Sequence, residues 1–241
     1  MKVFVAGATG AIGRPLVSAL VAARHEVVGM TSSEGGLRVL QKYGADGVVV
    51  NAFDSVAVNA AIGRVRPDAV IEELTSLPRD YTPEAMRATA ERDRKVRLEG
   101  GQNVYHAART AGARRYLVQS TGFFYGPGAR LASETDLLAG NASPGVSGSV
   151  RTYLQIEERV LGSRDLEAVA LRYRVFYGPG TYHDLDTGSV TRQVREQKYP
   201  VIGSGTGVYS FITWRMPRQQ PLRRLKAIPA CTTLWTTILQ R

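Results

Sequence analysis

The residues whose types and spacing most directly suggest chemistry are the glycine-rich run 7–13, Gly-Ala-Thr-Gly-Ala-Ile-Gly. An aliphatic segment precedes this run and an apolar-periodic segment follows it. In a strand–turn–helix unit of this kind, Gly7 permits the tight turn, Gly10 lets the backbone approach a pyrophosphate, and Gly13 allows the helix to pack closely on the strand. The helix N-terminus then offers free N–H groups and a partial positive charge to the phosphates. The run therefore predicts a dinucleotide site.

The residues after the second predicted strand bear on the choice of dinucleotide. An acidic residue there would bond the ribose 2′-hydroxyl of NAD, whereas a basic residue would accept the 2′-phosphate of NADP. This chain carries neither, because the strand ends in Met-Thr-Ser-Ser at residues 30–33. Thr31 and Ser32 could serve either ribose, and Arg38 is either a phosphate partner or part of a solvated helix face. The sequence predicts NAD or NADP without choosing between them.

The elements that must position these residues follow from the hydrophobic pattern, in which short aliphatic runs alternate with longer amphipathic segments. The predicted strands span residues 3–6, 26–30, 48–50, 69–71, 116–119 and 168–171, and the predicted helices span 12–23, 37–43, 55–65, 83–111 and 153–161. Such alternation predicts an α/β fold, a Rossmann-type doubly wound parallel sheet with helices on both faces. Ligands of such sheets bind beyond the carboxyl ends of the strands.

Composition limits the partners and the compartment. Hydrophobic residues make up 44% of the 241-residue chain, and the single Cys excludes a disulfide framework and a Cys-built zinc site. The three His are far apart in the sequence, so no metal site is predicted. No stretch approaches the roughly 20 apolar residues of a membrane span, so we expect a cytoplasmic protein without a membrane partner. The formal charge of +10 suggests nucleic acid, but the basic segment 87–97 lacks interleaved aromatics, and no nucleic-acid partner is predicted.

Three motifs resemble, in their order, the extended short-chain dehydrogenases/reductases, and more narrowly the NAD-dependent epimerase/dehydratase group. They are the glycine run 7–13, Ser-Thr-Gly at 120–122 before Tyr-Gly at 125–126, and Leu-Arg at 171–172 before Tyr-Gly-Pro-Gly at 177–180. The resemblance implies a Rossmann domain followed by a small substrate domain. It places Asn51 and Ala52 beside the adenine, and Leu74 and Thr75 beside the ribose and phosphates. The predicted cofactor contacts are Gly7, Thr9, Gly10, Ala11, Ile12, Gly13, Thr31, Ser32, Asn51, Ala52, Leu74, Thr75 and Tyr173.

The same resemblance assigns catalysis to a Ser or Thr after the fifth strand and to a Tyr-x-x-x-Lys helix. The hydroxyl position falls on Thr121, but the comparable helix, residues 149–158, contains no Lys. If Tyr153 is the usual Tyr, Glu157 stands at the Lys position, where a carboxylate raises the pKa of a neighbouring phenol. If Glu157 instead matches the acidic residue that follows the Lys, Tyr153 takes the Lys position and Ser149 the Tyr position. The short spacing to residues 171–172 favours this second register, and the dyad is broken in both.

The predicted activity is reversible hydride transfer between the nicotinamide of NAD or NADP and a carbonyl or hydroxyl carbon of a small, nucleotide-sugar-like substrate. Thr121 would orient the oxygen, and Tyr153 is the best remaining proton donor. Because the dyad is broken, a catalytically impaired dinucleotide-binding sensor is the alternative. The sequence leaves open whether the protein forms a homodimer.

The last segment differs in composition from the rest of the chain. Residues 213–241 contain both Trp, the single Cys, six Lys or Arg and no Asp or Glu. Back-translation one base earlier can yield His-Val-Glu-Asp-Ala from residue 213 and Gly-Val-Tyr-Asn-Ile-Val-Asp-Asp near 230–237, both resembling the family. We hypothesise a missing base near codon 212, with a genuine basic anion-binding extension as the alternative. The predicted organisation is an NAD(P)-binding domain at 1–172, a partial substrate domain at 173–212 and an out-of-frame tail at 213–241, without which the net charge is about +4.

Overall fold

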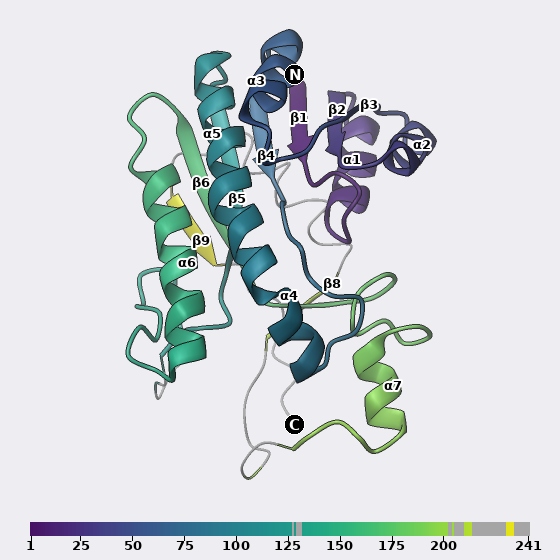
Figure 1. The fold of residues 1–241 in the computed structure, drawn as a ribbon, viewed down its shortest axis with the longest axis vertical. Coiled ribbons are helices and arrows are strands. Elements are labelled where there is room, and N and C mark those ends of the chain that lie inside the picture. Colours follow the sequence, from purple (N-terminus) through teal and green to yellow (C-terminus); the bar gives the residue numbers. More distant parts are fainter. Residues whose placement is uncertain (127, 129–131, 202–203, 205–209, 214–229, 234–241) are drawn as a thin grey trace.

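A computed structural model describes residues 1–126, 128, 132–201, 204, 210–213 and 230–233. Its main sheet is built from β1 (Lys2–Ala6), β2 (Glu26–Thr31), β3 (Asp46–Val49), β4 (Ala69–Glu72), β5 (Arg115–Thr121), β6 (Glu167–Tyr173) and β9 (Ala230–Thr233). These strands are parallel and lie in the order β3-β2-β1-β4-β5-β6-β9 (Figure 1). The predicted Rossmann-type doubly wound sheet is thus confirmed, and the strand order reverses between β1 and β4.

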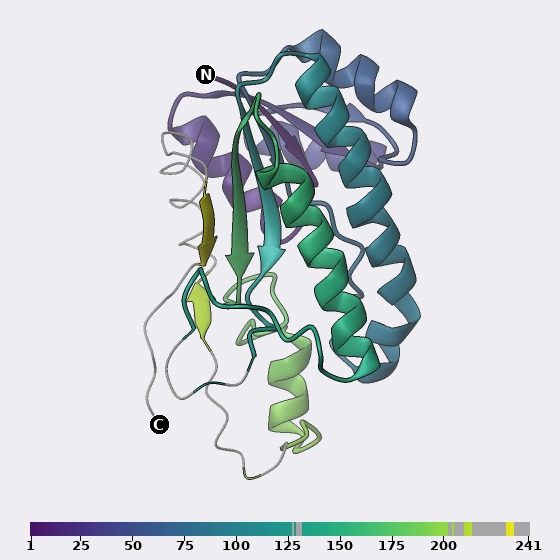
Figure 2. The same cartoon turned by 90° about the vertical axis from the view of Figure 1, so that its left-hand side faces the viewer.

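Helices cover both faces of this sheet (Figures 1 and 2). They are α1 (Gly13–Ala22), α2 (Glu34–Lys42), α3 (Ser55–Val65), α4 (Pro83–Lys95), α5 (Gly101–Thr110), α6 (Pro144–Leu161) and α7 (Ser189–Arg195), with a π-helical segment, η1 (Val96–Gly100), joining α4 to α5. Leu16 and Leu20 of α1 lie in one apolar core, which also holds Leu40 of α2. The other core holds Ile62 of α3 and Ile156 of α6. The alternating side chains of the strands separate the two cores.

The observed elements extend several of the predicted ones. Helix α3 spans Ser55–Val65, as predicted, whereas α6 begins at Pro144, nine residues before the predicted start. Gly and Ser residues fill the first turns of α6 and disfavour a helix by propensity, but Pro144 occupies a first-turn position that proline tolerates, and Val150 anchors the helix by full burial. The predicted helix 83–111 is interrupted by η1.

A smaller unit lies beyond the carboxyl ends of the strands (Figure 1). It contains α7 and a two-stranded parallel pair, β7 (Val175–Tyr177) with β8 (Phe211–Thr213). It contacts the segment after β4, where the Tyr182 hydroxyl donates to the Pro78 carbonyl at 2.5 Å and Arg192 pairs with Asp80 at 2.7 Å. This unit therefore borders the edge at which a ligand of the sheet would lie.

The predicted tail falls mostly outside the described residues, which omit 214–229 and 234–241. Its described part includes β9, whose backbone pairs with β6 from Val169 to Arg172. The domain boundaries and the frameshift stay predictions. Across the part of the chain that the structure describes, no helix combines the length and apolarity needed to cross a bilayer.

Candidate functional site

A cavity of about 250 Å³ opens at the carboxyl ends of β1 to β4, where the strand order reverses. Crevices at such switch points are the usual ligand sites of open α/β sheets. Its lining is contributed by the turns after four strands and by α4 and η1. The lining residues are Gly7, Thr9, Gly10, Met30, Thr31, Ser32, Val50, Asn51, Ala52, Phe53, Glu73, Leu74, Thr75, Ser76, Arg92 and Val96.

The glycine turn has the geometry that allows a ligand to approach the protein backbone closely. Gly7 has φ of +79°, and a Cβ there would lie 2.7 Å from the Glu73 carbonyl carbon, so no other residue fits without displacement of the backbone. A Cβ on Gly13 would overlap the Gly7 carbonyl oxygen. Helix α1 begins after Ile12 with no side-chain cap on its first N–H groups. The Arg14 nitrogen donates to the Gly10 carbonyl at 3.1 Å and Pro15 has no N–H, so it is the glycine cradle and the positive end of the helix that fit the pyrophosphate of a dinucleotide.

The structure brings nine of the predicted cofactor contacts into this one cavity, and four lie outside its lining. The nine are Gly7, Thr9, Gly10, Thr31, Ser32, Asn51, Ala52, Leu74 and Thr75. Ala11, Ile12 and Gly13 form the start of α1 instead, and Tyr173 is fully buried on β6. Their roles as contacts stay predictions.

At the end of β2, the side-chain hydroxyls of Thr31 and Ser33 accept hydrogen bonds from the backbone. Ser33 caps α2, with its Oγ 3.3 Å from the Gly36 nitrogen, while Thr31 Oγ1 accepts from the Ser33 nitrogen at 3.4 Å. Ser32 is left exposed at the cavity. Arg38 is exposed and does not line the cavity, whereas the α4 residue Arg92 does. Arg92, and not the predicted Arg38, is therefore the basic residue in the cavity wall that could meet a phosphate.

Two adjacent glutamates at the end of β4 are buried on opposite faces of the sheet. Glu72 Oε2 accepts from the Tyr116 hydroxyl at 2.5 Å and pairs with Arg159 at 3.3 Å. Glu73 accepts from the Tyr173 hydroxyl at 3.2 Å through Oε1, and its Oε2 has no hydrogen-bond partner among the described residues. Burial raises the pKa of Glu72, and burial raises the pKa of Glu73 to about 8. Neither glutamate was predicted from the sequence, where a carboxylate pair ending an otherwise apolar strand is the signal that could have identified them.

Glu157 is the centre of a buried ion-pair network. Arg172 donates to it through Nε at 2.7 Å and Nη2 at 2.6 Å, a bidentate arrangement, and the Ser120 hydroxyl donates to Oε1 at 2.5 Å. Arg172 also donates to the Tyr125 hydroxyl at 3.1 Å. Glu157 thus ties α6 to β5 and β6. This structural role favours the register in which Tyr153 takes the Lys position.

Tyr153 is half-buried beneath a cation. The Arg97 guanidinium carbon lies 5.1 Å from the centre of its ring, and the Phe124 ring centre lies 6.2 Å away. Burial raises the pKa of Tyr153, and the Arg97 charge opposes that rise. Glu157, which would raise this pKa in the first of the two registers, is engaged by Arg172 and is not among the causes of the rise. Arg97 is buried, paired with Asp93 at 2.7 Å, and carried by η1.

Thr121 and Tyr153 are not brought together by any contact among the described residues. Thr121 is buried at the end of β5, where its Oγ1 accepts from the Phe123 nitrogen at 3.2 Å. Neither residue lines the cavity. Ser149 is the other candidate for the Tyr position, and its hydroxyl donates a hydrogen bond to the Gly145 carbonyl of its own helix at 3.1 Å. Catalytic roles for Thr121 and Tyr153 therefore stay predictions.

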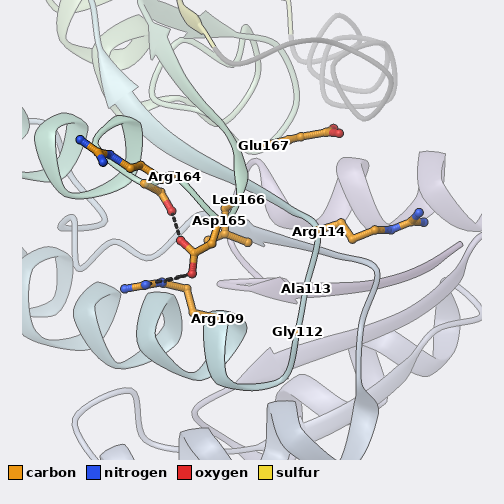
Figure 3. A pocket seen from close by; sticks show the side chains of 9 residues that line it. Arg109, Gly112, Ala113, Arg114, Arg164, Asp165, Leu166 and Glu167 are labelled. Atoms are coloured by element: carbon orange, nitrogen blue, oxygen red, sulfur yellow. Dashed lines mark hydrogen bonds and ion pairs between the residues drawn. The ribbon is translucent and has the colours of Figure 1, made fainter.

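A second, larger hollow of about 650 Å³ lies at the opposite end of the sheet (Figure 3). Its walls come from the segments just before β5 and β6, and the Arg109–Asp165 ion pair, 2.9 Å long, crosses it. In an open α/β sheet this is the end that does not bind ligands. The described residues contain no cluster of His, Cys, Asp or Glu that could hold a metal ion.

The sheet order, the glycine turn and the cavity at the switch point define a Rossmann-type dinucleotide-binding protein. The family model described as the NAD dependent epimerase/dehydratase family matches residues 3–215, and this chain belongs to that family. The cofactor of the family is NAD, in agreement with the predicted nicotinamide dinucleotide. A curated relative from Streptomyces sp., 3-diazoavenalumate denitrifying reductase, is 40% identical over 216 residues, which cover 88% of this chain and 68% of the relative.

Solved structures share the fold at low identity. UDP-glucose-4-epimerase from Stenotrophomonas maltophila has a TM-score of 0.76 at 19% identity, with 99% of this chain and 79% of that chain covered. UDP-glucose 4-epimerase from Thermus thermophilus has a TM-score of 0.73 at 23% identity, with 98% of this chain and 78% of that chain covered. Both were solved with NAD. At this identity the likeness concerns the fold alone.

Proposed function

We propose that this protein is an NAD(P)-dependent reductase that directs a hydride to a small substrate held beyond the carboxyl ends of β4 to β6. The observation that carries the proposal is the switch-point cavity with its glycine turn, inside a chain of the NAD dependent epimerase/dehydratase family. When bound there, the reduced nicotinamide supplies a hydride. The chain supplies the glycine turn and the N-terminal end of α1 for the pyrophosphate, and the residues at the ends of β2 and β3 for the adenosine half.

The substrate class is the open part of the proposal, and two classes compete. The sequence motifs favour a carbonyl or hydroxyl carbon. The name of the 40%-identical relative describes the reductive removal of nitrogen from a diazo compound. We favour this second class, a substrate with an activated C–N₂ group.

The missing dyad supports a diazo substrate on chemical grounds. Reduction of a carbonyl consumes a hydride and a proton, so it needs a placed acid. In a diazonium group, the hydride forms a C–H bond while the C–N bond breaks and its electron pair leaves with N₂, so R–N₂⁺ and H⁻ give R–H and N₂. This step consumes no proton. Tyr153 is held under Arg97, and the Ser149 hydroxyl is hydrogen-bonded to its own helix. A reaction that consumes no proton does not require either hydroxyl to act as an acid.

The test is NADH oxidation with two substrate panels, aryl diazonium salts and simple aldehydes or ketones, with N₂ release measured in parallel. We expect NADH oxidation that is matched by N₂ release with the diazonium panel. Turnover confined to the carbonyl panel would support the first substrate class instead. NADH binding without turnover of either panel would support the alternative of a dinucleotide-binding sensor.

A matched pair of variants separates the classes further. Tyr153→Phe removes the phenol hydroxyl and keeps the ring under Arg97 and beside Phe124. We expect diazonium reduction to continue within about twofold of the wild-type rate, whereas carbonyl reduction, if it occurs, falls about 100-fold with the loss of its acid. The exposed neighbour Leu154→Ala serves as the control.

A further inference from the structure

One residue of the cavity lining carries a buried polar atom that has no hydrogen-bond partner among the described residues. Glu73 is 5% exposed and belongs to the lining, and its Oε2 has no hydrogen-bond partner among the described residues. A buried carboxyl oxygen without a partner is costly. Glu73 adjoins the glycine turn, because its carbonyl group lies where a Gly7 side chain would be. The carboxyl oxygen without a partner therefore belongs to a residue that lines the cavity and whose backbone abuts the glycine turn.

The other oxygen of the same carboxyl is fixed. The Tyr173 hydroxyl donates to Oε1 at 3.2 Å, across a sequence separation of 100 residues. Tyr173 is itself fully buried and packs against Phe176 with ring centres 5.1 Å apart. A carboxyl whose Oε1 already accepts from a phenol can carry its proton on Oε2, where it acts as a donor.

Burial, more than the charged groups around it, favours the uncharged form of Glu73 at neutral pH. Burial raises its pKa to about 8, and the negative Glu72 adds to the rise. The Tyr173 hydroxyl and the positive Arg97 act against it, and Arg92 is a further cation in the cavity lining. The pKa of Tyr173 lies well above its usual range because of burial beside Glu73, so this phenol stays a donor throughout.

We propose that Glu73 is a ligand-contacting residue of the cavity, whose protonated Oε2 donates a hydrogen bond to an acceptor oxygen of the bound dinucleotide. The proposal rests on the assignment of this cavity as the dinucleotide site. Binding then requires the protonated carboxyl, because an ionised Glu73 would present a second acceptor and a negative charge to a dinucleotide that is already anionic. Affinity is thus coupled to the charge of one buried side chain.

The experiment is the dissociation constant of NADH, without substrate, between about pH 6.5 and about pH 9.5. If only the protonated form binds, the affinity of the wild type falls about thirtyfold over this range, since a group with a pKa of about 8 is then about 1.5 units past its midpoint. NADH has no group that titrates in this window, so the change belongs to the protein.

Three variants assign the effect. Glu73→Gln keeps an oxygen for Tyr173 and an N–H donor at the Oε2 position, so we expect tight binding with no pH dependence. Glu73→Leu removes the donor, so we expect weak binding at every pH. Glu72→Gln is the control. Glu72 is buried next along the chain but faces Tyr116 and Arg159, so we expect the fall in affinity to be retained, with its midpoint moved to lower pH because the Glu72 charge contributes to the raised pKa of Glu73.

Three results overturn the proposal, and they separate its two premises. A wild-type affinity that does not change with pH, or a Glu73→Gln variant that follows the wild type, refutes the role of Glu73 and leaves the dinucleotide site standing. Failure of the wild type to bind NADH at about pH 6.5 refutes the dinucleotide site itself, and the proposal with it.

Discussion

Replacing Glu73 by Gln changes how the stability of the ligand-free protein depends on pH. The folded state raises the pKa of this carboxyl from its ordinary 4.5 to about 8. The folded protein therefore holds a proton that the unfolded chain releases between these values. A group of this kind contributes stability that is fully present below about pH 4.5 and is lost as the pH rises through about 8. The Gln variant has no such proton and no such loss.

The size of the effect follows from the shift. A difference of about 3.5 units at about 1.36 kcal/mol per unit gives a limit of about 5 kcal/mol. Between about pH 5 and about pH 7.5, the unfolded chain gains about 3 kcal/mol relative to the folded state from the ionisation of Glu73. Because every other titrating group is common to both proteins, the difference in unfolding free energy between Glu73→Gln and wild type isolates this contribution.

Urea unfolding at the two pH values provides the measurement. We expect the Gln variant to become more stable relative to wild type by about 3 kcal/mol on going from about pH 5 to about pH 7.5. Glu158→Gln, an exposed change on α6, should show no such trend. A constant difference between the Glu73 variant and wild type would refute the claim that this carboxyl is buried uncharged.

Three further predictions concern the scaffold, the glycine turn and the reading frame. Glu157→Ala removes the bidentate carboxylate partner of the buried Arg172 and should cost about 3–5 kcal/mol of unfolding free energy in urea, whereas the exposed Glu158→Ala should cost under about 0.5 kcal/mol. Gly13→Ala drives a Cβ into the Gly7 carbonyl and should lower the melting temperature and weaken NADH binding. Gly63→Ala, which meets no atom within 4 Å on α3, should instead stabilise by about 0.5–1 kcal/mol. Resequencing the coding DNA across codon 212 should reveal a missing base, and an intact frame contradicts the out-of-frame tail.

Local sequence patterns predicted the part of the site that is formed by residues close together in the sequence. The glycine run predicted the turn between β1 and α1, because its glycines meet steric demands that arise within the turn itself. The alternation of strands and helices predicted the sheet, since buried parallel strands are apolar and short. Nine of the thirteen predicted cofactor contacts line the cavity, and four of these nine, Asn51, Ala52, Leu74 and Thr75, were implied by the family resemblance and not by a local pattern.

The parts that sequence reasoning missed depend on contacts between distant residues. Glu73 meets Tyr173 across 100 residues, and Arg97 of η1 faces Tyr153 of α6. No periodicity encodes such pairs. The π-helical turn that carries Arg97 was also missed, because it continues a regular helical pattern and differs from it only in its hydrogen bonding.

The most direct test of the reductase proposal is the fate of an isotopic label carried by the cofactor. The protein is supplied with NADH deuterated at the transferring carbon, together with an aryl diazonium salt, and the product is examined by mass spectrometry. Hydride transfer predicts one deuterium at the carbon that bore N₂, with N₂ released in equal amount. Product without deuterium, or NADH that binds and is never oxidised, would contradict hydride transfer by this protein.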